Sequence, residues 1–439
     1  MQETPAPGVP VLPLATTLRE TAAATLAPVL KLYLDLHAHP ELSGQEERTA
    51  ARFAAALTAA GWTATTGVGG HGVVGVLRNG EGPTVLLRTE LDALPVQEDT
   101  GLPYASEARA TGPDGVEVPV MHACGHDAHA AALTGAARVL AALRAEWSGT
   151  VVIVGQPAEE TLSGARAMLA DGLYDRFPRP DVALAQHVAP FPAGLVAHGT
   201  GPMTAASATV EATVHGRGGH AGMPHLAVNA AEIAALAVAR MKARTPAGTV
   251  LTVGALHAGT RANVVPDRAT LGITVRAADD AAVTAAVELV REALRAESET
   301  AGGPRPPETE VTARAPGNVN DARYGALVRA AHAAELGERR VVGWPSSTAS
   351  EDFPWYGRAG AAEGLYEGPA VPTVYWMTGG VGAEQWSRAG SPGASPAEKL
   401  AVLPPNHSPK FAPEAVATLR GAVHAMAAGA LACLGPGAP

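Results

Sequence analysis

The chain has 439 residues, of which 47% are hydrophobic and 17% charged, so it can bury more than one core and we expect two domains. Its 32 basic and 42 acidic residues give a formal net charge of −10, without a lysine or arginine run that would follow a phosphate backbone, which argues against a nucleic-acid partner. The longest apolar stretches, such as 131–143, are too short and too interrupted by arginine to span a bilayer, so we expect no membrane partner.

In chain order, the first part of the sequence predicts alternating helices and strands. Residues 1–30 lack the basic start and leucine-rich core of a secretory signal, which predicts a cytoplasmic protein. The patterns that follow predict helices over 19–36, 43–61 and up to Leu143, and strands over 72–78, 84–95 and 150–155. We therefore predict an α/β fold with ligands at the carboxyl ends of its strands.

The middle of the chain follows a different order and predicts an inserted domain over 204–314. Alternating strands and two alanine-rich helices give a β-α-β-β-α order, with the helices over 227–243 and 280–298. Residues 301–310, AGGPRPPETE, are expected to be a linker back to the first domain. The first domain then comprises 1–203 and 315–439.

The segment MHACGHDAHAAAL, residues 121–133, contains the densest group of metal-binding side-chain types. Cys124 and His126 are two residues apart, so in an extended segment both point to one side and can bind one ion. The spacing alone leaves three interpretations open: a metal site, a reactive thiol, or the polar start of a helix.

Further candidate ligands follow at comparable places in the predicted sheet. Glu159 and Glu160 come directly after the strand at 150–155, so one could bind metal while the other moves protons. His187 ends the apolar run DVALAQH, and His407 lies in the loop LPPNHSPKF. Each alone is more often structural, but together they favour a metal site.

These segments, in this order, are similar to those of the M20 amidohydrolases and metallopeptidases, in the branch of hippurate hydrolase and the plant auxin-conjugate hydrolases. The matching segments run through nearly the whole chain: LHAHPELSGQEERTA, RTELDALPVQE, MHACGHDAHAAALTGAA, GQPAEETLSGARAML, QHVAPFPAG, GRGGHAGMPH, ANVVPDRATLGITVR, ASEDF and NHSPKF. The resemblance implies a zinc-peptidase-like catalytic domain with a mixed, mostly parallel sheet, plus an inserted α+β ferredoxin-like lid and dimerisation domain.

The resemblance also implies a site with two divalent ions, manganese or zinc first and cobalt or nickel as alternatives. Cys124 bridges the ions in this scheme, and the other implied ligands are His126 and His187 on one ion and Glu160 and His407 on the other. Glu159 is implied as the general base that acts on a metal-activated water.

Other residues receive supporting roles from the same resemblance. In the inserted domain His220 and Asn263 are implied to stabilise the oxyanion, with His220 reaching across a dimer interface, and Arg276 to bind a substrate carboxylate. Asp92 and Asp127 are expected to hold the ligand imidazoles in place, with His122 and His129 also supporting them.

The predicted function is hydrolysis of the amide bond in N-acyl amino acids or related conjugates by a homodimer. One departure from the family pattern is Glu90, which stands where the family has aspartate and extends the side chain by one methylene. The alternatives are a dipeptidase or aminopeptidase of the same superfamily, a non-catalytic small-molecule binding protein, and a thiol hydrolase that uses Cys124 as nucleophile.

Overall fold

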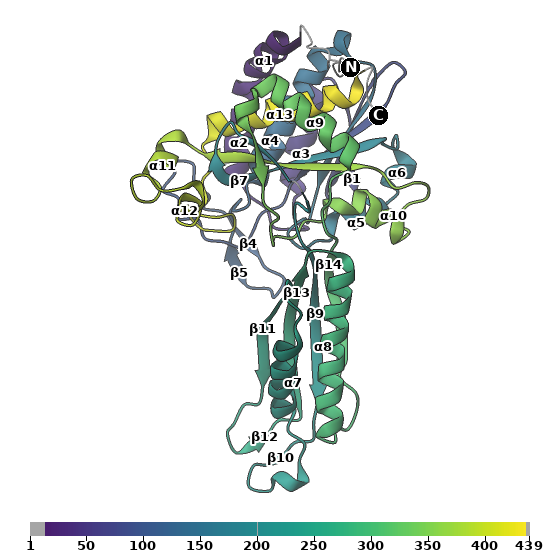
Figure 1. The fold of residues 1–439 in the computed structure, drawn as a ribbon, viewed down its shortest axis with the longest axis vertical. Coiled ribbons are helices and arrows are strands. Elements are labelled where there is room, and N and C mark those ends of the chain that lie inside the picture. The colour runs from purple at the N-terminus through teal and green to yellow at the C-terminus, as the bar shows by residue number, and fades with distance from the viewer. Residues whose placement is uncertain (1–13, 200, 436–439) are drawn as a thin grey trace, which may run out of the picture. The chain divides into compact units, whose positions relative to one another are not determined.

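The structure is a computed structural model that describes residues 14–199 and 201–435. The first 13 residues, part of the stretch from which we predict location, lie outside this range. Contacts along the chain divide it into two compact units, coloured by sequence in Figure 1. Unit 1 comprises residues 1–201, 320–345 and 355–439, and unit 2 comprises 202–319 and 346–354.

Unit 1 is built on a sheet that contains eight of the described strands, in the order β1-β2-β6-β3-β7-β16-β8-β15. The four central strands β6, β3, β7 and β16 are parallel neighbours, whereas β1, β2 and β8 pair antiparallel with at least one neighbour. The strands are β1 (Thr63–Val68), β2 (Gly72–Asn79), β3 (Thr84–Glu90), β6 (Gly149–Gln156), β7 (Val182–Pro192), β8 (Val196–Gly199), β15 (Val341–Trp344) and β16 (Thr373–Val381). This mixed, mostly parallel sheet confirms the predicted α/β class.

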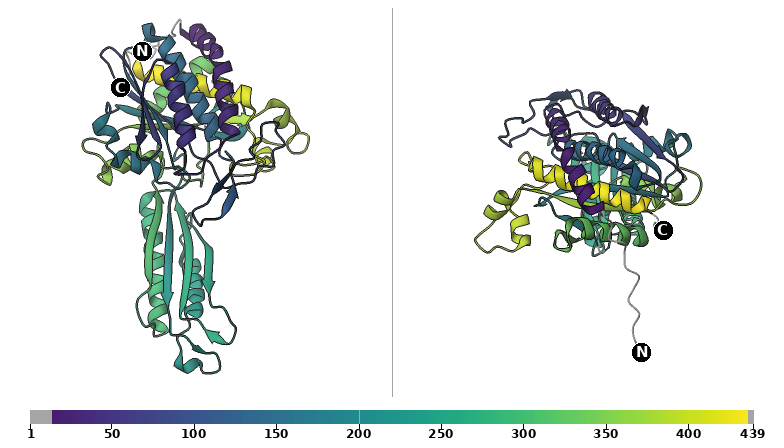
Figure 2. Two further views of the ribbon diagram at one scale, coloured as in Figure 1. Left: turned by 180° about the vertical axis from the view of Figure 1, so that it is seen from behind. Right: turned by 90° about the horizontal axis from the view of Figure 1, so that it is seen from above.

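Strand burial explains why the central sequences are apolar throughout. Every residue of β6 and of β16 is buried, because helices or loops cover both faces of the sheet at these positions. Helices α2, α4 and α13 pack against each other and α4 and α13 against the central strands (Figure 2). The helices of unit 1 are α1 (Leu14–Ala24), α2 (Leu26–His37), α3 (Glu47–Ala59), α4 (His126–Ala142), α5 (Gly164–Ala170), α6 (Leu173–Arg176), α9 (Ala322–Leu336), α10 (Arg358–Ala362), α11 (Ala383–Arg388), α12 (Pro396–Leu400) and α13 (Ala415–Leu434).

The helix predicted over 19–36 is in fact two helices, α1 and α2, that meet at Thr25. Pro28 explains the break, because proline lacks a backbone N–H and its ring collides with the carbonyl four residues earlier, at Ala24. Among the described helices, α13 is long and apolar enough to cross a membrane, yet 67% of its apolar window is buried inside the protein. Such burial is typical of a core helix.

Unit 2 contains a four-stranded antiparallel sheet in the order β11-β13-β9-β14, with helices α7 and α8 packed on it. Its elements are β9 (Ala206–His215), α7 (Ala230–Arg244), β11 (Val250–Ala258), β13 (Arg268–Ala277), α8 (Asp280–Thr300) and β14 (Glu308–Ala315). The β-α-β-β-α-β order and this strand order are those of a ferredoxin-like fold. The core of unit 2 lies between α7, α8 and the sheet.

The predicted linker at 301–310 is partly wrong, because β14 already begins at Glu308 and pairs with β9. Much of β14 is exposed at the edge of the sheet, and its first residues, ETEV, are mostly polar. The strand therefore lacks the apolar pattern by which a strand is predicted from sequence. Residues 346–354, predicted in the catalytic domain, belong to unit 2: Ala205 N donates to Ala349 O at 3.1 Å and Ser350 Oγ to Ser207 Oγ at 2.7 Å.

Candidate metal centre

The six candidate metal and proton-transfer residues all belong to unit 1 and come from four segments of the chain. Cys124 and His126 lie at the start of α4, and His187 lies on β7. Glu159 and Glu160 follow β6, and His407 lies in the loop before α13. The parallel order of β6 and β7 in the sheet brings their carboxyl ends to the same edge, as expected for an α/β protein.

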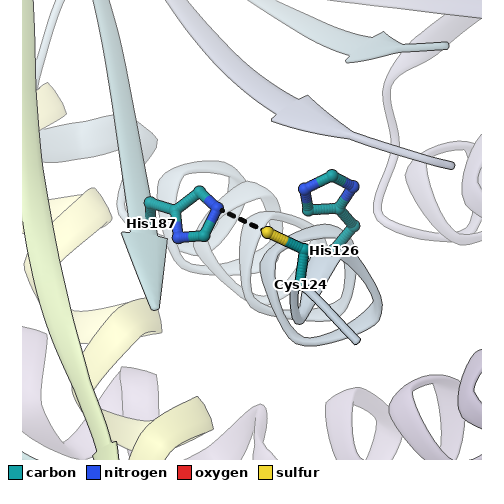
Figure 3. Close-up of side chains that lie close together, drawn as sticks. All are labelled: Cys124, His126 and His187. Carbon is teal, nitrogen blue, oxygen red and sulfur yellow. Dashed lines mark hydrogen bonds between the residues drawn. The ribbon is translucent and has the colours of Figure 1, made fainter. Parts of the chain in front are cut away.

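Cys124 lies at the centre of this group. Its Sγ is 3.3 Å from His187 Nε2 and 3.3 Å from His407 Nε2. Figure 3 shows the contact with His187 and the position of His126 beside Cys124 at the helix start. Gly125, between Cys124 and His126, has φ 83°, and this left-handed residue is the N-cap of α4, which begins at His126.

The hydrogen bonds of two imidazoles leave their Nε2 atoms as the coordinating atoms. His187 Nδ1 is 2.7 Å from the carbonyl oxygen of Val188, and His126 Nδ1 is 3.0 Å from the carbonyl of Asp92 and 3.1 Å from its Oδ1. Because oxygen atoms accept, each Nδ1 carries the proton. His126 Nε2 is buried and has no hydrogen-bond partner among the described residues, as a metal ligand would require.

Two sets of three donor atoms share Cys124. The first is Cys124, His126 and His187; the second is Cys124, Glu160 and His407. Within each set the ligand atoms lie within 4.8 Å of one another, and His407 Nε2 is 3.5 Å from Glu160 Oε2. Thiol, imidazole and carboxylate donors suit zinc and related divalent metals, so these residues fit a two-ion site.

The carboxylates of Glu159 and of Glu160, the latter a member of the second set, both lie beside His126 of the first set. His126 Nε2 is 3.9 Å from Glu159 Oε2 and 3.9 Å from Glu160 Oε1. Glu159 is 6% exposed, so its carboxyl group lies beside the donors in a largely water-excluded place. A carboxylate there can exchange a proton with a group bound at the donors.

The protonation of these groups depends strongly on burial. Burial, followed by the charges of Glu160 and Glu159, raises the pKa of the Cys124 thiol well above its ordinary value. Burial lowers the pKa of His126, but Asp92 outweighs this and raises it to about 10. Burial holds the pKa of His187 well below its ordinary value. The bare thiol is therefore protonated near neutral pH, which makes it a poor nucleophile, and metal must displace protons from Cys124 and His126.

Asp92 makes the kind of contact predicted for it, and Asp127 does not. Asp92 Oδ1 accepts from His126, and Oδ2 accepts from Ser43 Oγ at 2.7 Å and from Glu160 N at 2.9 Å. Burial raises the pKa of Asp92, but these hydrogen bonds, that of His126 foremost, outweigh it and keep the pKa low. Asp127 instead lies 2.7 Å from Nδ1 of His37, because it is one position further round the helix than His126.

The remaining histidines of the motif differ in their contacts. His129 Nδ1 is 2.8 Å from Glu90 Oε2, and its Nε2 accepts from the Val188 N–H at 2.7 Å. His129 thus contacts the backbone of the strand residue directly after His187. His122 is buried, and neither of its ring nitrogens has a hydrogen-bond partner among residues 14–199 and 201–435.

Glu90, which replaces the family aspartate, is fully buried between two partners. Its Oε1 pairs with Arg88, and its Oε2 with His129. Burial raises the pKa of Glu90, but the charge of Arg88 and the hydrogen bond from His129 outweigh burial and hold it well below its ordinary value. The carboxylate is therefore fixed in a salt bridge behind the site and is not among the donors next to Cys124.

The predicted residues of the inserted domain form no single cluster in unit 2. His220 and Asn263 line an open pocket of about 600 Å³ that Arg268 also borders. Arg276 is eight positions further along β13, and at about 3.4 Å per residue it lies roughly 27 Å from Arg268. There its Nη1 donates to Thr348 O at 2.6 Å and to Ser350 Oγ at 2.9 Å.

Asn406 is a site residue that sequence reasoning did not single out. Its Nδ2 donates to the carbonyls of Cys124 and Val188, each at 3.2 Å, and so ties the His407 loop to both neighbouring elements. His407 itself has φ 69°, a left-handed conformation uncommon outside glycine. The signal that could have identified Asn406 is its place directly before a candidate ligand in a loop.

Comparisons with known proteins agree with this geometry. The profile of peptidase family M20/M25/M40 matches residues 86–383. The N-acetylcysteine deacetylase of Bacillus subtilis is 32% identical over 375 residues, which cover 82% of this chain and 90% of that protein. The hippurate hydrolase of Campylobacter jejuni is 37% identical over 258 residues, 57% of this chain and 64% of that protein.

A crystal structure from Bacillus subtilis, described as a dinuclear metal-binding peptidase from the M20 family, is similar over nearly the whole chain. It has a TM-score of 0.71 and 25% sequence identity, and covers 94% of this chain and 99% of that one. For some curated relatives the aligned region spans just under two thirds of their own length. The family profile, the relatives and the fold lead to one assignment: the chain is a hydrolase that belongs to peptidase family M20/M25/M40, in its amidohydrolase branch.

Proposed function

We propose that the protein hydrolyses the amide bond of N-acyl amino acids or related conjugates. The observation that carries this proposal is the pair of three-donor sets that share Cys124, with a buried glutamate beside them that belongs to neither. A small-molecule binding protein needs no such additional carboxylate, whereas a hydrolase needs a group that moves protons. The relatives named as a deacetylase of N-acetylcysteine and a hippurate hydrolase support the substrate class.

In this proposal His126 and His187 would hold one divalent ion and Glu160 and His407 a second, with Cys124 contributing to both sets. Manganese or zinc is our first expectation, and cobalt or nickel are the alternatives. When bound, such ions acidify water and polarise an amide carbonyl. Asp92 contributes by fixing the His126 tautomer and the Glu160 backbone at the same time.

Glu159 acts as the general base in this proposal. Its carboxylate takes a proton from the attacking water and passes it to the nitrogen of the leaving amine, so that the amine leaves neutral. Its distance of 3.9 Å from His126 Nε2 places it beside the donor atoms. Glutamine at position 159 keeps the shape but cannot take up the proton.

His220 and Asn263 are proposed to stabilise the oxyanion, and Arg276 to bind the substrate carboxylate. Since the His220 pocket and Arg276 lie at opposite ends of β13, roughly 27 Å apart, one N-acyl amino acid cannot touch both within one copy of unit 2. This separation supports a homodimer in which His220 acts on the substrate of the partner subunit. A cytoplasmic location also remains a prediction.

The Glu159→Gln variant tests the mechanism. We expect hydrolysis of N-acetylcysteine and of N-benzoylglycine to fall by about 10²- to 10⁴-fold while the number of bound metal ions is unchanged. Full activity of this variant would remove Glu159 as the base. A protein from which chelation removes all metal without loss of hydrolysis would contradict the two-ion mechanism.

Two further measurements separate the alternatives. Dipeptides assayed beside the N-acyl amino acids distinguish the amidohydrolase from a dipeptidase or aminopeptidase, which would cleave dipeptides faster. Mixed dimers, with His220→Ala in one subunit and Glu159→Gln in the other, should recover part of the activity. Dimers without recovered activity would contradict catalysis across the interface.

A further inference from the structure

The loop that presents Glu159 and Glu160 has an unfavourable backbone conformation. Ala158 has φ 52° and Leu162 has φ 57°, and both lie in the left-handed region that side chains with a Cβ rarely adopt. The carbonyl of Ala158 accepts from Ser163 N at 3.2 Å and Gly164 N at 3.1 Å, which closes the turn. Such a conformation persists only where the surroundings hold it.

Glu46 supplies the contact that holds this loop from outside. Its Oε1 accepts from Ala158 N at 2.8 Å and from Gly44 N at 2.7 Å. A second carboxylate, Asp92, accepts from Glu160 N. The backbone on either side of Glu159 is therefore held by two separate acids from other parts of the chain.

The contact of Glu46 cannot be explained as the capping of its own helix. Glu46 is the residue directly before α3, yet its side chain makes no capping bond to that helix. Glu41 does this instead: its Oε1 accepts from Arg48 N at 3.0 Å and its Oε2 from Thr49 N at 2.7 Å. The Glu46 side chain instead accepts from the backbone N–H of Gly44 and from that of Ala158, in the loop that presents Glu159 and Glu160.

Burial makes this position unfavourable for a carboxyl group. Glu46 is fully buried, and its Oε2 has no hydrogen-bond partner among the described residues. Burial raises the pKa of Glu46 above its ordinary value. An apolar residue would avoid these costs, so the presence of glutamate requires a benefit, and the contact with Ala158 provides one.

We infer that Glu46 is a positioning residue for catalysis, which fixes the Ala158 turn and thereby the direction of the Glu159 carboxylate. The inference rests on the proposed function, because it assumes that Glu159 transfers the proton. Glu46 has no role in binding the ions, since Asp92 holds Glu160 independently. Loss of Glu46 should therefore impair the proton transfer and leave the metal in place.

The test compares Glu46→Ala, Glu46→Gln and Glu41→Ala. With N-acetylcysteine or N-benzoylglycine, whichever turns over faster, we expect Glu46→Ala to lower kcat by about 10- to 100-fold, as for other losses of alignment, with KM and metal content within about 2-fold of the parent. Glu46→Gln keeps an oxygen that accepts from Ala158 N, so its kcat should stay within about 3-fold. Glu41→Ala removes the α3 cap and should lower stability without lowering kcat.

Hydrogen–deuterium exchange measures the loop without reference to activity. The peptide that covers 157–164 should exchange faster in Glu46→Ala and at the parental rate in Glu46→Gln and Glu41→Ala. Should Glu46→Ala not fold, Glu46→Asp shortens the reach by one methylene and should show the same changes in kcat and exchange. Glutamine restores the acceptor, so its rescue separates the lost contact from general destabilisation.

Parental kcat and parental exchange in Glu46→Ala, or in Glu46→Asp if the alanine variant does not fold, would overturn the inference. An equal fall of kcat in Glu41→Ala would do the same, since it would attribute the effect to the helix. Glu159→Gln, assayed in parallel, keeps the two proposals distinguishable. An active Glu159→Gln variant contradicts the proposed base, whereas an inactive one beside a fully active Glu46→Ala contradicts only the positioning role.

Discussion

Gly125→Ala is the substitution whose cost follows most directly from the geometry of the metal centre. Gly125 lies between Cys124 and His126 with φ 83°, and a Cβ there would lie 2.4 Å from Cγ1 of Val188. The left-handed conformation costs alanine about 1–2 kcal/mol, and forcing the methyl group against Val188 costs about 1–3 kcal/mol. We therefore expect a loss of about 2–5 kcal/mol in the free energy of unfolding.

The assay is urea unfolding together with metal content, with two control variants. Gly61 has φ 84° and no atom within 4 Å of an added Cβ among the described residues, so Gly61→Ala should show the conformational cost alone. Val188→Ala removes the opposing methyl groups, and combined with Gly125→Ala it should recover about 1–3 kcal/mol. We also expect Gly125→Ala to bind fewer ions, because the added methyl group displaces Cys124 relative to His187.

If Gly125→Ala shifts the urea midpoint no more than Gly61→Ala does, and Val188→Ala gives no recovery, the close approach of Gly125 to β7 is refuted. Parental metal content in a destabilised Gly125→Ala variant would refute the link from this turn to the metal centre while leaving the packing argument intact. The two readouts therefore test packing and ligand placement separately.

Three further predictions concern charge and protonation. Glu90→Asp withdraws its carboxylate from His129 and Arg88, so we expect a loss of about 1–3 kcal/mol in stability, measured by urea unfolding, and unchanged stability would contradict the buried pairing. The metal-free protein should react with iodoacetamide at Cys124 more slowly than a free cysteine does, because burial raises the pKa of the thiol. Mass spectrometry measures the alkylation, and rapid alkylation would favour the alternative in which Cys124 is the nucleophile of a thiol hydrolase. Burial lowers the pKa of His198 to about 3 and of His332 to about 4, so the unfolded state binds more protons between pH 6.5 and about 4 and stability should fall as pH drops through this window. For His332 alone the full loss is about 3 kcal/mol, and a His332→Gln variant with an unreduced pH slope in urea unfolding would contradict it.

The candidate donors were expected from sequence because several metal-binding residue types follow apolar runs or lie in loops in the order of family M20, although no one of them is decisive alone. Glu159 and Glu160 follow an unbroken apolar run, and the two-residue spacing of Cys124 and His126 can be seen in the sequence without knowledge of the fold. The contacts of supporting residues depend instead on how helices rotate against each other. Asp127 was expected to hold a ligand imidazole, but the packing of α2 beside α4 presents His37 to it. The sequence alone does not predict how α2 and α4 are rotated about their axes, and so it does not predict which side chain Asp127 contacts.

The role of Glu46 was equally hidden, because a glutamate at a helix start is ordinarily read as a residue of the first turn. Only the structure shows that Glu41 caps the helix and that Glu46 reaches a loop 112 residues later. The break between α1 and α2 could have been predicted, since Pro28 was visible in the sequence. The start of strand β14 was not predicted, because its exposed positions carry polar residues and give no apolar alternation.

The contact between Cys124 and His407 joins residues that are 283 positions apart. A ribosome that has not yet translated the His407 codon therefore holds a chain in which one of the two donor sets is incomplete, however well the preceding sheet has folded. Strand β16 and helix α13 are also translated after the other strands of the sheet. A chain that stops before residue 407 therefore keeps the donor set of Cys124, His126 and His187, but it lacks the second set and also helix α13, which packs against α4 and the central strands.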